Sequence, residues 1–326
     1  MSPRAGAGPI PVIIVSYNTC DLLRECLASL ALAEAPVLPV VVDNASADGS
    51  AAMVRAEFPA AALLEPGANL GFARANNLGI RHALERCRPP ALLLLNPDAA
   101  LTAGALERLL DFLAAHPRVG MVAPRLIYPD GGRQPAAFRF PTLLMTAFDF
   151  WPPRGRGFGR LYDHPLNGRY REDGGAEPFP IDHPLGAAML VRTEVIEETG
   201  AFDESFWLYA EEVEWCWRIR RAGWAIWQQP QATVIHAGGA SSAQFRTRSF
   251  LALQRARLQF FDKAHGAAWG RAHRLLARAA ALHATLNAGL AWARGRIDGA
   301  ELRRRTWAMA ELWRLMRPAA ANRKQL

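Results

Sequence analysis

A regular alternation of strand-like and helix-like segments in the first 127 residues constrains the fold more than any other feature. Apolar runs at 11–18, 37–46, 91–95 and 119–127 alternate with amphipathic stretches such as 21–33 and 104–117. The runs are continuous rather than alternating in polarity, which is typical of strands covered on both faces. The pattern therefore predicts an α/β fold with a doubly wound, mostly parallel sheet.

Polar loops follow three of these predicted strands, with the sequences SYNTCD, DNASADGS and NPDAA. Ligands of such sheets bind outside the carboxyl ends of the strands, so we expect the three loops to lie on one rim. The loops would bring these side chains to a ligand: Ser16, Tyr17, Asn18, Asp43, Asn44, Asn96 and Asp98.

Two carboxylates stand out on this predicted rim. Pro97 ends the run of leucines because it has no N–H to donate, and Asp98 follows it directly; Asp43 ends the neighbouring strand in the same way. Each could be a helix cap or turn residue, and DNASADGS is also a good turn sequence, so Asn44 keeps that interpretation. Two carboxylates on one rim of a chain with net charge +8 favour a metal–phosphate or ribose role, with Mg²⁺ or Mn²⁺ as the metal.

The strongly basic balance favours anionic partners: phosphorylated small molecules, nucleic acid or an acidic membrane surface. The four cysteines form no CxxC pair, so reduced thiols are expected and a zinc site is not. We expect a cytoplasmic protein, because the N-terminal apolar run is shorter than a signal sequence and no uncharged stretch reaches the length of a membrane span.

A carboxylate-rich segment, YAEEVEWCWRIRRAG at 209–223, is a second candidate site. A solvated helix with i,i+4 ion pairs is the default interpretation of such a charge run. Large aromatic side chains surround Glu211 and Glu212 in the sequence, and they would favour raised pKa values and a general-base role. His236 ends another β-branched strand, where it could equally be a structural histidine.

Composition divides the chain into two expected domains. Residues 128–180 form an irregular connection rich in Pro, Gly and Arg, and the chain is helical and arginine-rich from about 245. We predict a catalytic domain at 1–245, with a donor half at about 10–127 and an acceptor and catalytic half at about 180–240, then a basic helical extension at 246–326.

Six segments, in order and spacing, resemble family 2 glycosyltransferases: VIIVSYN, VVVDNASADGS, NLGFARANNLGI, LLLLNPDAAL, FDESFWLYAEEVEWCWRIRRAGW and VIHAGG. The nearest resemblance is to bacterial rhamnosyltransferase-like enzymes of cell-surface polysaccharide assembly, and it covers roughly residues 10–265. It implies the glycosyltransferase A fold, which is a Rossmann-like, mostly parallel sheet flanked by helices. It also implies an inverting single displacement and a divalent metal, Mg²⁺ or Mn²⁺, that bridges the diphosphate of a sugar nucleotide.

The resemblance also implies roles for individual residues. Asp98 matches the metal-binding position and His236 a metal-associated histidine, while the Glu211–Glu212 pair supplies the catalytic base, which we place on Glu212. Asp43 matches a contact to the nucleotide base or ribose. The remaining donor-binding positions are Ser16, Tyr17, Asn18, Asn44, Asn69, Gly71, Phe72, Asn76 and Asn96.

Three positions depart from the family pattern. Asn96 replaces the first aspartate of the metal motif, which leaves fewer anionic ligands, and Glu212 replaces the commoner aspartate, which changes the reach of the base. The segment IDHPLGAAML lacks the family's tryptophan-bearing acceptor sequence, so acceptor specificity does not transfer.

The expected partners are a nucleotide-diphosphate sugar and a glycan or polyprenyl-linked acceptor, with rhamnose one candidate sugar and no nucleic acid. A nicotinamide-dependent oxidoreductase fits poorly, because the first strand–helix turn has no GxGxxG. A nucleotidyltransferase would need a glycine- and cation-rich loop there. A non-catalytic nucleic-acid-binding or membrane-binding protein would explain the basic pI, but no reader motif is present.

The basic tail predicts peripheral contact with the inner face of the cytoplasmic membrane. Leu302, Met309, Leu312 and Met316 form an apolar stripe, with Trp307, Trp313 and the arginines 303–305, 314 and 317 beside it. The alternative is an ordinary amphipathic helix that packs on the catalytic domain.

Overall fold

A computed structural model describes residues 8–152, 165–170, 172, 175–238 and 246–317. The chain divides into two compact units. The first, here called the sheet unit, contains residues 1–140 and 170–240; the second, the helical unit, contains 141–169 and 241–326.

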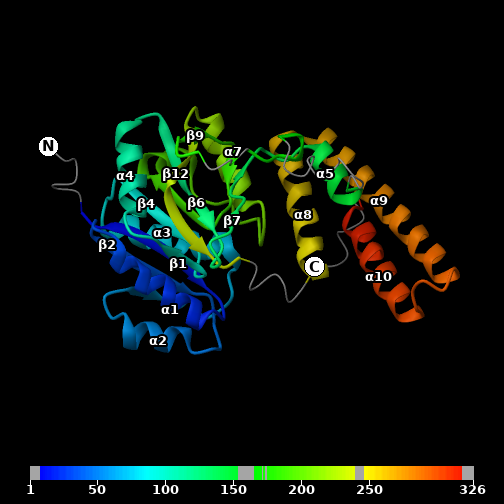
Figure 1. Ribbon diagram of the computed structural model, residues 1–326, viewed down its shortest axis with the longest axis horizontal. Coiled ribbons are helices and arrows are strands. Elements are labelled where there is room, and N and C mark those ends of the chain that lie inside the picture. Colours follow the sequence, from blue (N-terminus) through cyan, green and yellow to red (C-terminus); the bar gives the residue numbers. More distant parts are fainter. Residues whose placement is uncertain (1–7, 153–164, 171, 173–174, 239–245, 318–326) are drawn as a thin grey trace. The chain divides into compact units, whose positions relative to one another are not determined.

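The sheet unit opens with the alternation that the sequence predicts (Figure 1). Its strands are β1 Ile10–Ser16, β2 Val37–Asp43, β3 Ala62–Leu64, β4 Ala91–Leu95, β5 Ala99–Leu101, β6 Val119–Ile127, β7 Arg133–Gln134, β8 Ala137–Phe138, β9 Phe179–Pro180, β10 His183–Pro184, β11 Ala188–Arg192 and β12 Ala225–His236. Its helices are α1 Cys20–Ser29, η1 Leu30–Leu32, α2 Ser50–Glu57, α3 Gly71–Arg86, α4 Ala105–Ala115, α6 Thr193–Thr199 and α7 Glu211–Arg221.

The main sheet has the strand order β3-β2-β1-β4-β11-β6-β12-β5. Strands β1, β2, β3 and β4 are mutually parallel, and β12 is parallel to β6. Because β11 is antiparallel to both β4 and β6, those two also run the same way, so six strands end at one rim. The parallel part was predicted; the antiparallel strands β11 and β5 were not.

Helices cover both faces of this sheet, as the run of leucines predicted. Leu93 and Leu95 of β4 pack in a core with residues of α1, α2 and α4. Leu92 and Leu94 pack on the opposite face with residues of α3, α6 and α7. Helix α3 lies so close to the sheet that a Cβ on Gly79 would come within 2.5 Å of Ile13 Cγ2.

The region 128–180 contains more structure than its composition suggested. Strands β7, β8 and β9 belong to the sheet unit, whereas α5 (Leu143–Phe150) and η3 (Pro165–Asn167) belong to the helical unit. The arginine-rich stretch at 153–164 lies outside the described residues.

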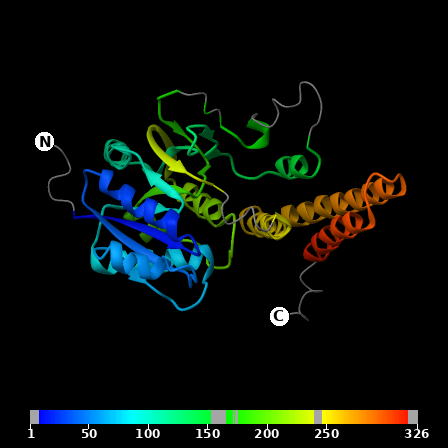
Figure 2. The same ribbon diagram turned by 60° about the horizontal axis from the view of Figure 1, so that its bottom comes forward.

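The helical unit consists of α5 with α8 (Arg246–Ala264), α9 (Ala267–Ala293) and α10 (Gly299–Leu315). Helices α9 and α10 lie side by side in both ribbon views (Figure 1, Figure 2). The sequence predicted that the helical extension begins at residue 246. Residues 141–169 also belong to the helical unit, because the apolar helix α5 packs on α9 through residues such as Phe150.

The apolar stripe of α10 stabilises this unit. Leu312 and Met316 are fully buried against Ala277 and Ala281 of α9, and Met309 packs beside them. These side chains are therefore not available to a bilayer, in contrast to the role predicted for the stripe. Within the described part of the chain, no helix combines the length and apolar character needed to span a membrane.

Candidate active site

The predicted site residues lie where parallel strands end. Ser16 ends β1 and pairs in register with Asp43, which ends β2; Asn96 follows β4, and His236 ends β12. The strand order reverses between β1 and β4, and such a switch point is where doubly wound sheets form a ligand crevice.

Asp98 and His236 are brought together by the pairing of β5 with β12, which sets His236 opposite Ala99. The Nε2 atom of His236 lies 3.2 Å from Oδ1 of Asp98, and both side chains are largely buried. On the other side of the ring, Nδ1 lies 2.8 Å from Oε1 of Gln134. No sequence pattern points to Gln134, because its two-residue strand β7 is defined only by its pairing with β6.

These contacts fit a divalent cation. Nδ1–H of His236 donates to the Gln134 oxygen, which leaves Nε2 facing the Asp98 oxygen, and a divalent cation held by both residues would satisfy these two groups. No cluster of three or more His, Cys, Asp or Glu side chains suited to a metal exists among the described residues. Two protein ligands completed by substrate phosphates are common for Mg²⁺ and Mn²⁺.

Asp43 has an unused hydrogen-bonding atom. Its Oδ2 accepts from Ser46 N at 3.1 Å, but Oδ1 is buried without a partner among the described residues. A buried carboxylate oxygen without a donor is costly, so this atom suits a hydroxyl or N–H of a ligand.

Several predicted donor-binding residues hold the rim loops in shape. The Asn44 side chain donates to Asn69 Oδ1 at 3.0 Å and accepts from Leu70 N at 2.7 Å, and Asn69 Oδ1 also accepts from Gly71 N. Gly71 has φ +76°, and a Cβ there would lie 3.0 Å from the Trp207 carbonyl oxygen. Glycine is therefore required by both conformation and space.

Two further predicted donor residues, Phe72 and Asn76, have structural contacts at the start of α3. Phe72 packs edge-on against Phe202 with ring centroids 5.7 Å apart, and the Asn76 side chain donates to the Phe72 carbonyl oxygen at 3.0 Å. Direct contact of either side chain with a donor stays a prediction.

The loop after β1 is tied to the loop after β2. Asn18, at φ +52°, accepts from Ala47 N at 2.8 Å, and Ser16 Oγ lies 2.9 Å from Thr19 Oγ1. The Tyr17 ring between them is 48% exposed, so it is accessible to a planar group of a ligand.

Glu211 and Glu212 begin α7 immediately after Tyr209 and Ala210, two non-glycine residues in left-handed conformation at φ +70° and +62°. Such strain is common at functional sites. A Cβ on Gly186 would lie 3.5 Å from Glu212 Cγ, and the next carbonyl oxygen, that of Ala187, accepts from Asn96 N at 2.8 Å. Glu212 is therefore at the rim where β4 ends.

Both carboxyl groups have raised pKa values. Burial, followed by the neighbouring Glu212, raises the pKa of Glu211, whose Oε2 is buried without a partner among the described residues. Burial raises the pKa of Glu212 to about 7. Glu212 as a whole residue is less buried than Glu211. A carboxylate with this pKa is suited to general-base catalysis near neutral pH.

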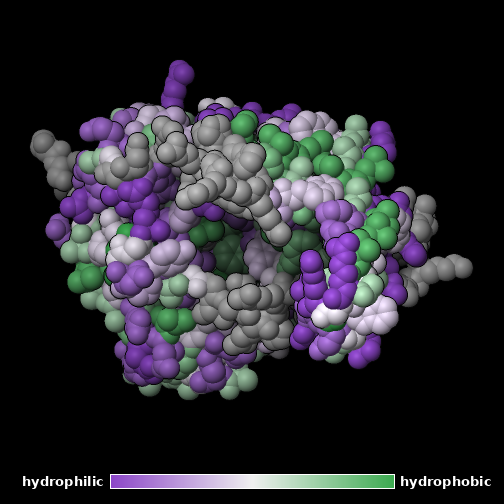
Figure 3. All heavy atoms as spheres, turned by 45° about the vertical axis from the view of Figure 1, so that its right-hand side comes forward, coloured by the Kyte–Doolittle hydropathy of each residue, from purple (hydrophilic) through white to green (hydrophobic). Residues whose placement is uncertain are grey.

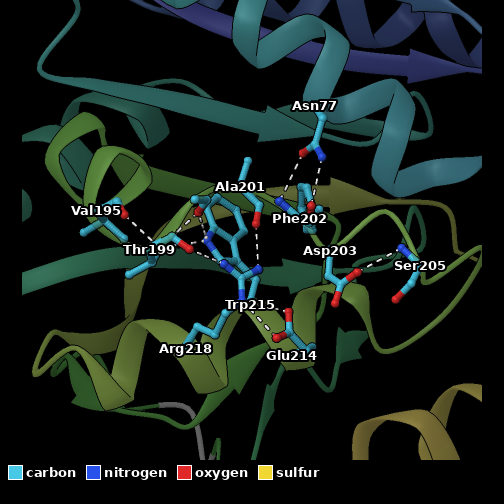
Figure 4. Close-up of polar contacts among 11 residues, drawn as sticks. Asn77, Val195, Thr199, Ala201, Phe202, Asp203, Ser205, Glu214, Trp215 and Arg218 are labelled. Atoms are coloured by element: carbon cyan, nitrogen blue, oxygen red, sulfur yellow. Dashed lines mark hydrogen bonds and ion pairs between the residues drawn. The ribbon is translucent and has the colours of Figure 1, made fainter. Parts of the chain in front are cut away.

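A polar network holds α7 and the loop before it in place (Figure 4). Arg218 pairs with Glu214 at 2.9 Å and donates to the carbonyl oxygens of Thr199 and Ala201. Asn77 of α3 holds the backbone of Phe202, accepting from its N–H at 3.0 Å and donating to its carbonyl oxygen at 2.9 Å. Glu214 and Arg218 thus form an i,i+4 ion pair of the kind expected for this charge run, and the pair is partly buried and helps to hold α7 in place.

The helical unit contains a groove of about 750 Å³ between α5, α9 and α10. Its lining includes Trp151, His283 and Arg305, and none of the predicted donor or catalytic residues. The predicted donor and catalytic residues therefore lie in the sheet unit and outside this groove.

Comparison with known proteins identifies the family. Residues 12–200 match the model of "Glycosyl transferase family 2". The chain belongs to glycosyl transferase family 2. As a family 2 member it is a glycosyltransferase, and the alternatives of an oxidoreductase, a nucleotidyltransferase and a non-catalytic basic protein are not supported.

Two of the relatives are named as rhamnosyltransferases. The chain is 30% identical over 275 residues to an N-acetylglucosaminyl-diphospho-decaprenol L-rhamnosyltransferase of Mycobacterium tuberculosis, covering 80% of this chain and 86% of the relative. It is 23% identical over 235 residues to the dTDP-rhamnosyl transferase RfbF of Shigella flexneri, covering 72% and 71%. The predicted resemblance to rhamnosyltransferase-like enzymes is confirmed.

The fold is similar to that of the mannosyltransferase PcManGT from Pyrobaculum calidifontis in complex with GDP-Man and Mn²⁺. The TM-score is 0.56 at 20% identity, covering 96% of this chain and 87% of that one. The predicted glycosyltransferase A fold with a C-terminal helical region is confirmed.

Proposed function

We propose that this family 2 enzyme is an inverting glycosyltransferase that uses a nucleotide-diphosphate sugar and a carboxylate general base. The observation that carries the proposal is the position of Glu212, whose pKa is raised to about 7, at the sheet rim where Asn96 and Asp98 follow β4. A single displacement needs only a base for the acceptor hydroxyl and a stabilised leaving group.

Asp98 and His236 would hold a divalent cation, Mg²⁺ or Mn²⁺, together with the donor diphosphate. When bound, the cation would neutralise charge on the departing diphosphate. The Mn²⁺ in the complex of PcManGT supports this assignment. Gln134 would keep His236 in the orientation that its contact to Nδ1 defines.

In the proposed reaction, Glu212 accepts the proton of an acceptor hydroxyl as that oxygen bonds to the anomeric carbon of the sugar. The bond from this carbon to the diphosphate oxygen breaks on the opposite side, so the configuration inverts and the nucleotide diphosphate leaves. Glu212 then returns the proton to solvent. Asp43 Oδ1 would accept a hydrogen bond from the nucleotide, and the negative charge of Glu212 would help to keep the buried Glu211 protonated.

The names of the relatives guide the choice of substrates. The mycobacterial relative transfers L-rhamnose to a diphospho-decaprenol-linked sugar, and RfbF is a dTDP-rhamnosyl transferase. We therefore propose dTDP-rhamnose as the donor and a polyprenyl-diphosphate-linked glycan as the acceptor. Such an acceptor resides in a membrane, so the enzyme would work as a peripheral protein at the inner face of the cytoplasmic membrane.

A donor screen tests this proposal. Release of nucleotide diphosphate is measured with dTDP-rhamnose, UDP-galactose, UDP-glucose or GDP-mannose, with Mg²⁺ or Mn²⁺, in the presence of an N-acetylglucosaminyl-diphospho-polyprenol. We expect turnover that needs metal and is greatest with dTDP-rhamnose. Turnover with another donor would correct the sugar, and NMR showing a product of retained configuration would overturn the mechanism.

A further inference from the structure

Helix α9 carries an exposed face of leucines that no other described element covers. Four leucines recur at spacings of seven, four and four residues, which confines them to an arc of about 80° on the helix. They are Leu275, Leu282, Leu286 and Leu290, with 67%, 54%, 58% and 52% of their surfaces exposed; we call them the leucine face.

The leucine face points away from the core of the helical unit. The residues of α9 that pack against α10, such as Ala277 and Ala281, are fully or almost fully buried and lie about 160° around the helix from the leucines. The face is therefore an additional apolar surface, about 22 Å long at 1.5 Å per residue, that the helical unit does not need for its own packing. Exposed apolar surface of this extent usually marks an interaction site.

Cations flank this face at both ends. Arg271 is exposed one turn before Leu275, and Arg294 and Arg296 are exposed just after the end of α9. Trp292, also exposed, adds an indole at the same end. Over the helical unit, hydrophobic and strongly hydrophilic side chains lie next to each other (Figure 3).

The net charge of the helical unit distinguishes between two candidate partners of the leucine face, a second copy of this chain and an anionic lipid bilayer. Residues 246–317 contain 15 Lys and Arg against 4 Asp and Glu. A second copy would bring two such cationic units together, which like-charge repulsion opposes, whereas an anionic bilayer offers both the opposite charge and an apolar interior.

We propose that the leucine face of α9 docks on an anionic lipid bilayer, with the leucines at the level of the acyl chains and the flanking arginines at the headgroups. The inference rests on the proposed function in one respect: docking would bring the enzyme to its lipid-linked acceptor. It assigns membrane contact to α9 and not to the stripe of α10, of which Leu312 and Met316 are buried.

Co-sedimentation with phosphatidylcholine vesicles, with and without phosphatidylglycerol, tests the proposal on the full chain at low and high salt. We expect binding to the anionic vesicles that weakens at high salt. The triple variant Leu282→Gln/Leu286→Gln/Leu290→Gln should reduce the bound fraction by about tenfold or more, because it removes the apolar contact and leaves every arginine. Leu32→Gln, which changes a leucine exposed by 50% in η1 of the sheet unit, should bind as the wild type does.

Two further measurements keep the outcomes distinct. Circular dichroism should show that the triple variant retains its helices, since the replaced side chains are exposed. Nucleotide diphosphate release with a water-soluble short-chain acceptor should be unchanged in the triple variant. Loss of release in every protein would count against the proposed function and not against docking.

Undiminished vesicle binding by the triple variant would overturn the inference. So would a wild-type dimer in sedimentation velocity that the triple variant abolishes, because a second copy would then be the occupant.

Discussion

His236 Nε2 lies 3.2 Å from Asp98 Oδ1, although the two residues are far apart in the sequence. The short strand β5 makes the contact possible, because it pairs antiparallel with β12 and sets Ala99 opposite His236. A carboxylate and an imidazole thus share one position at the rim, with Gln134 behind the imidazole. The predictions below start from this pair and from the Glu211–Glu212 pair.

Asp98→Ala should abolish metal-dependent turnover and leave the fold intact, because Asp98 lies in a rim loop and outside the apolar core. Steady-state kinetics at saturating metal measures the effect. Asp21→Ala, which changes an exposed carboxylate of α1, is the control. More than about a tenth of the wild-type kcat in the Asp98 variant, a loss below about 1.4 kcal/mol, would exclude the metal assignment.

Gln134→Leu should weaken metal-dependent binding of a nucleotide diphosphate by about 10–100-fold, because Nδ1–H of His236 loses its acceptor and the ring loses its orientation. Calorimetric titration with Mn²⁺ and dTDP measures this. Gln228→Leu is a matched control, since Gln228 is equally buried but donates to the Pro124 carbonyl oxygen. An equal loss in both variants would show a general effect on stability.

Glu212→Gln should lower kcat by about 10²–10⁴-fold without weakening nucleotide diphosphate binding, because the amide keeps the shape of the carboxylate but accepts no proton. Turnover and calorimetry are measured on the same preparation. Glu211→Gln is the paired variant. Full turnover in the Glu212 variant, with loss in the Glu211 variant, would exchange the two roles.

The rate should depend on pH through Glu212. A base acts in its deprotonated form, so kcat/KM should rise with pH and level off above about 7, the raised pKa of Glu212. The stability of the fold should change with pH in the opposite direction. Folding favours the protonated carboxyl group of Glu212, so the contribution of this group to the free energy of unfolding is complete below the ordinary pKa of Glu and declines as the pH rises through about 7. Glu212→Gln should flatten both the kcat/KM profile and this part of the Tm–pH curve. A wild-type kcat/KM that does not change between pH 6 and 8 would contradict the assignment.

Asn77→Ala should reduce the free energy of unfolding by about 1–3 kcal/mol, because it leaves the buried N–H and carbonyl oxygen of Phe202 without partners. Urea denaturation measures the loss. kcat should also fall, since Phe202 begins the loop that leads to Glu211 and Glu212. Asn287→Ala, at an exposed position of α9 in the helical unit, is a control remote in sequence from this loop. An unchanged midpoint would show that the Asn77 contacts contribute little.

The sequence by itself determined the alternation of β1, β2, β4 and β6 with their helices, because each segment bears its own period of apolar residues. β6 was predicted at 119–127 and observed at Val119–Ile127, and the continuous leucines of β4 correctly indicated cover on both faces. The motifs also placed Asp43, Asn96 and His236 at strand ends, because parallel strands finish at one rim.

Only the tertiary structure decided which of these residues meet. The insertion of β11 between β4 and β6, the β5–β12 pairing behind the Asp98–His236 contact, and the position of Gln134 all arise from strands that pair across long stretches of chain. Such pairings leave no local period in the sequence. The same reason applies to α10 and α9. Both are amphipathic, and only their packing shows that Leu312 and Met316 of the α10 stripe are buried while the leucines of α9 stay exposed.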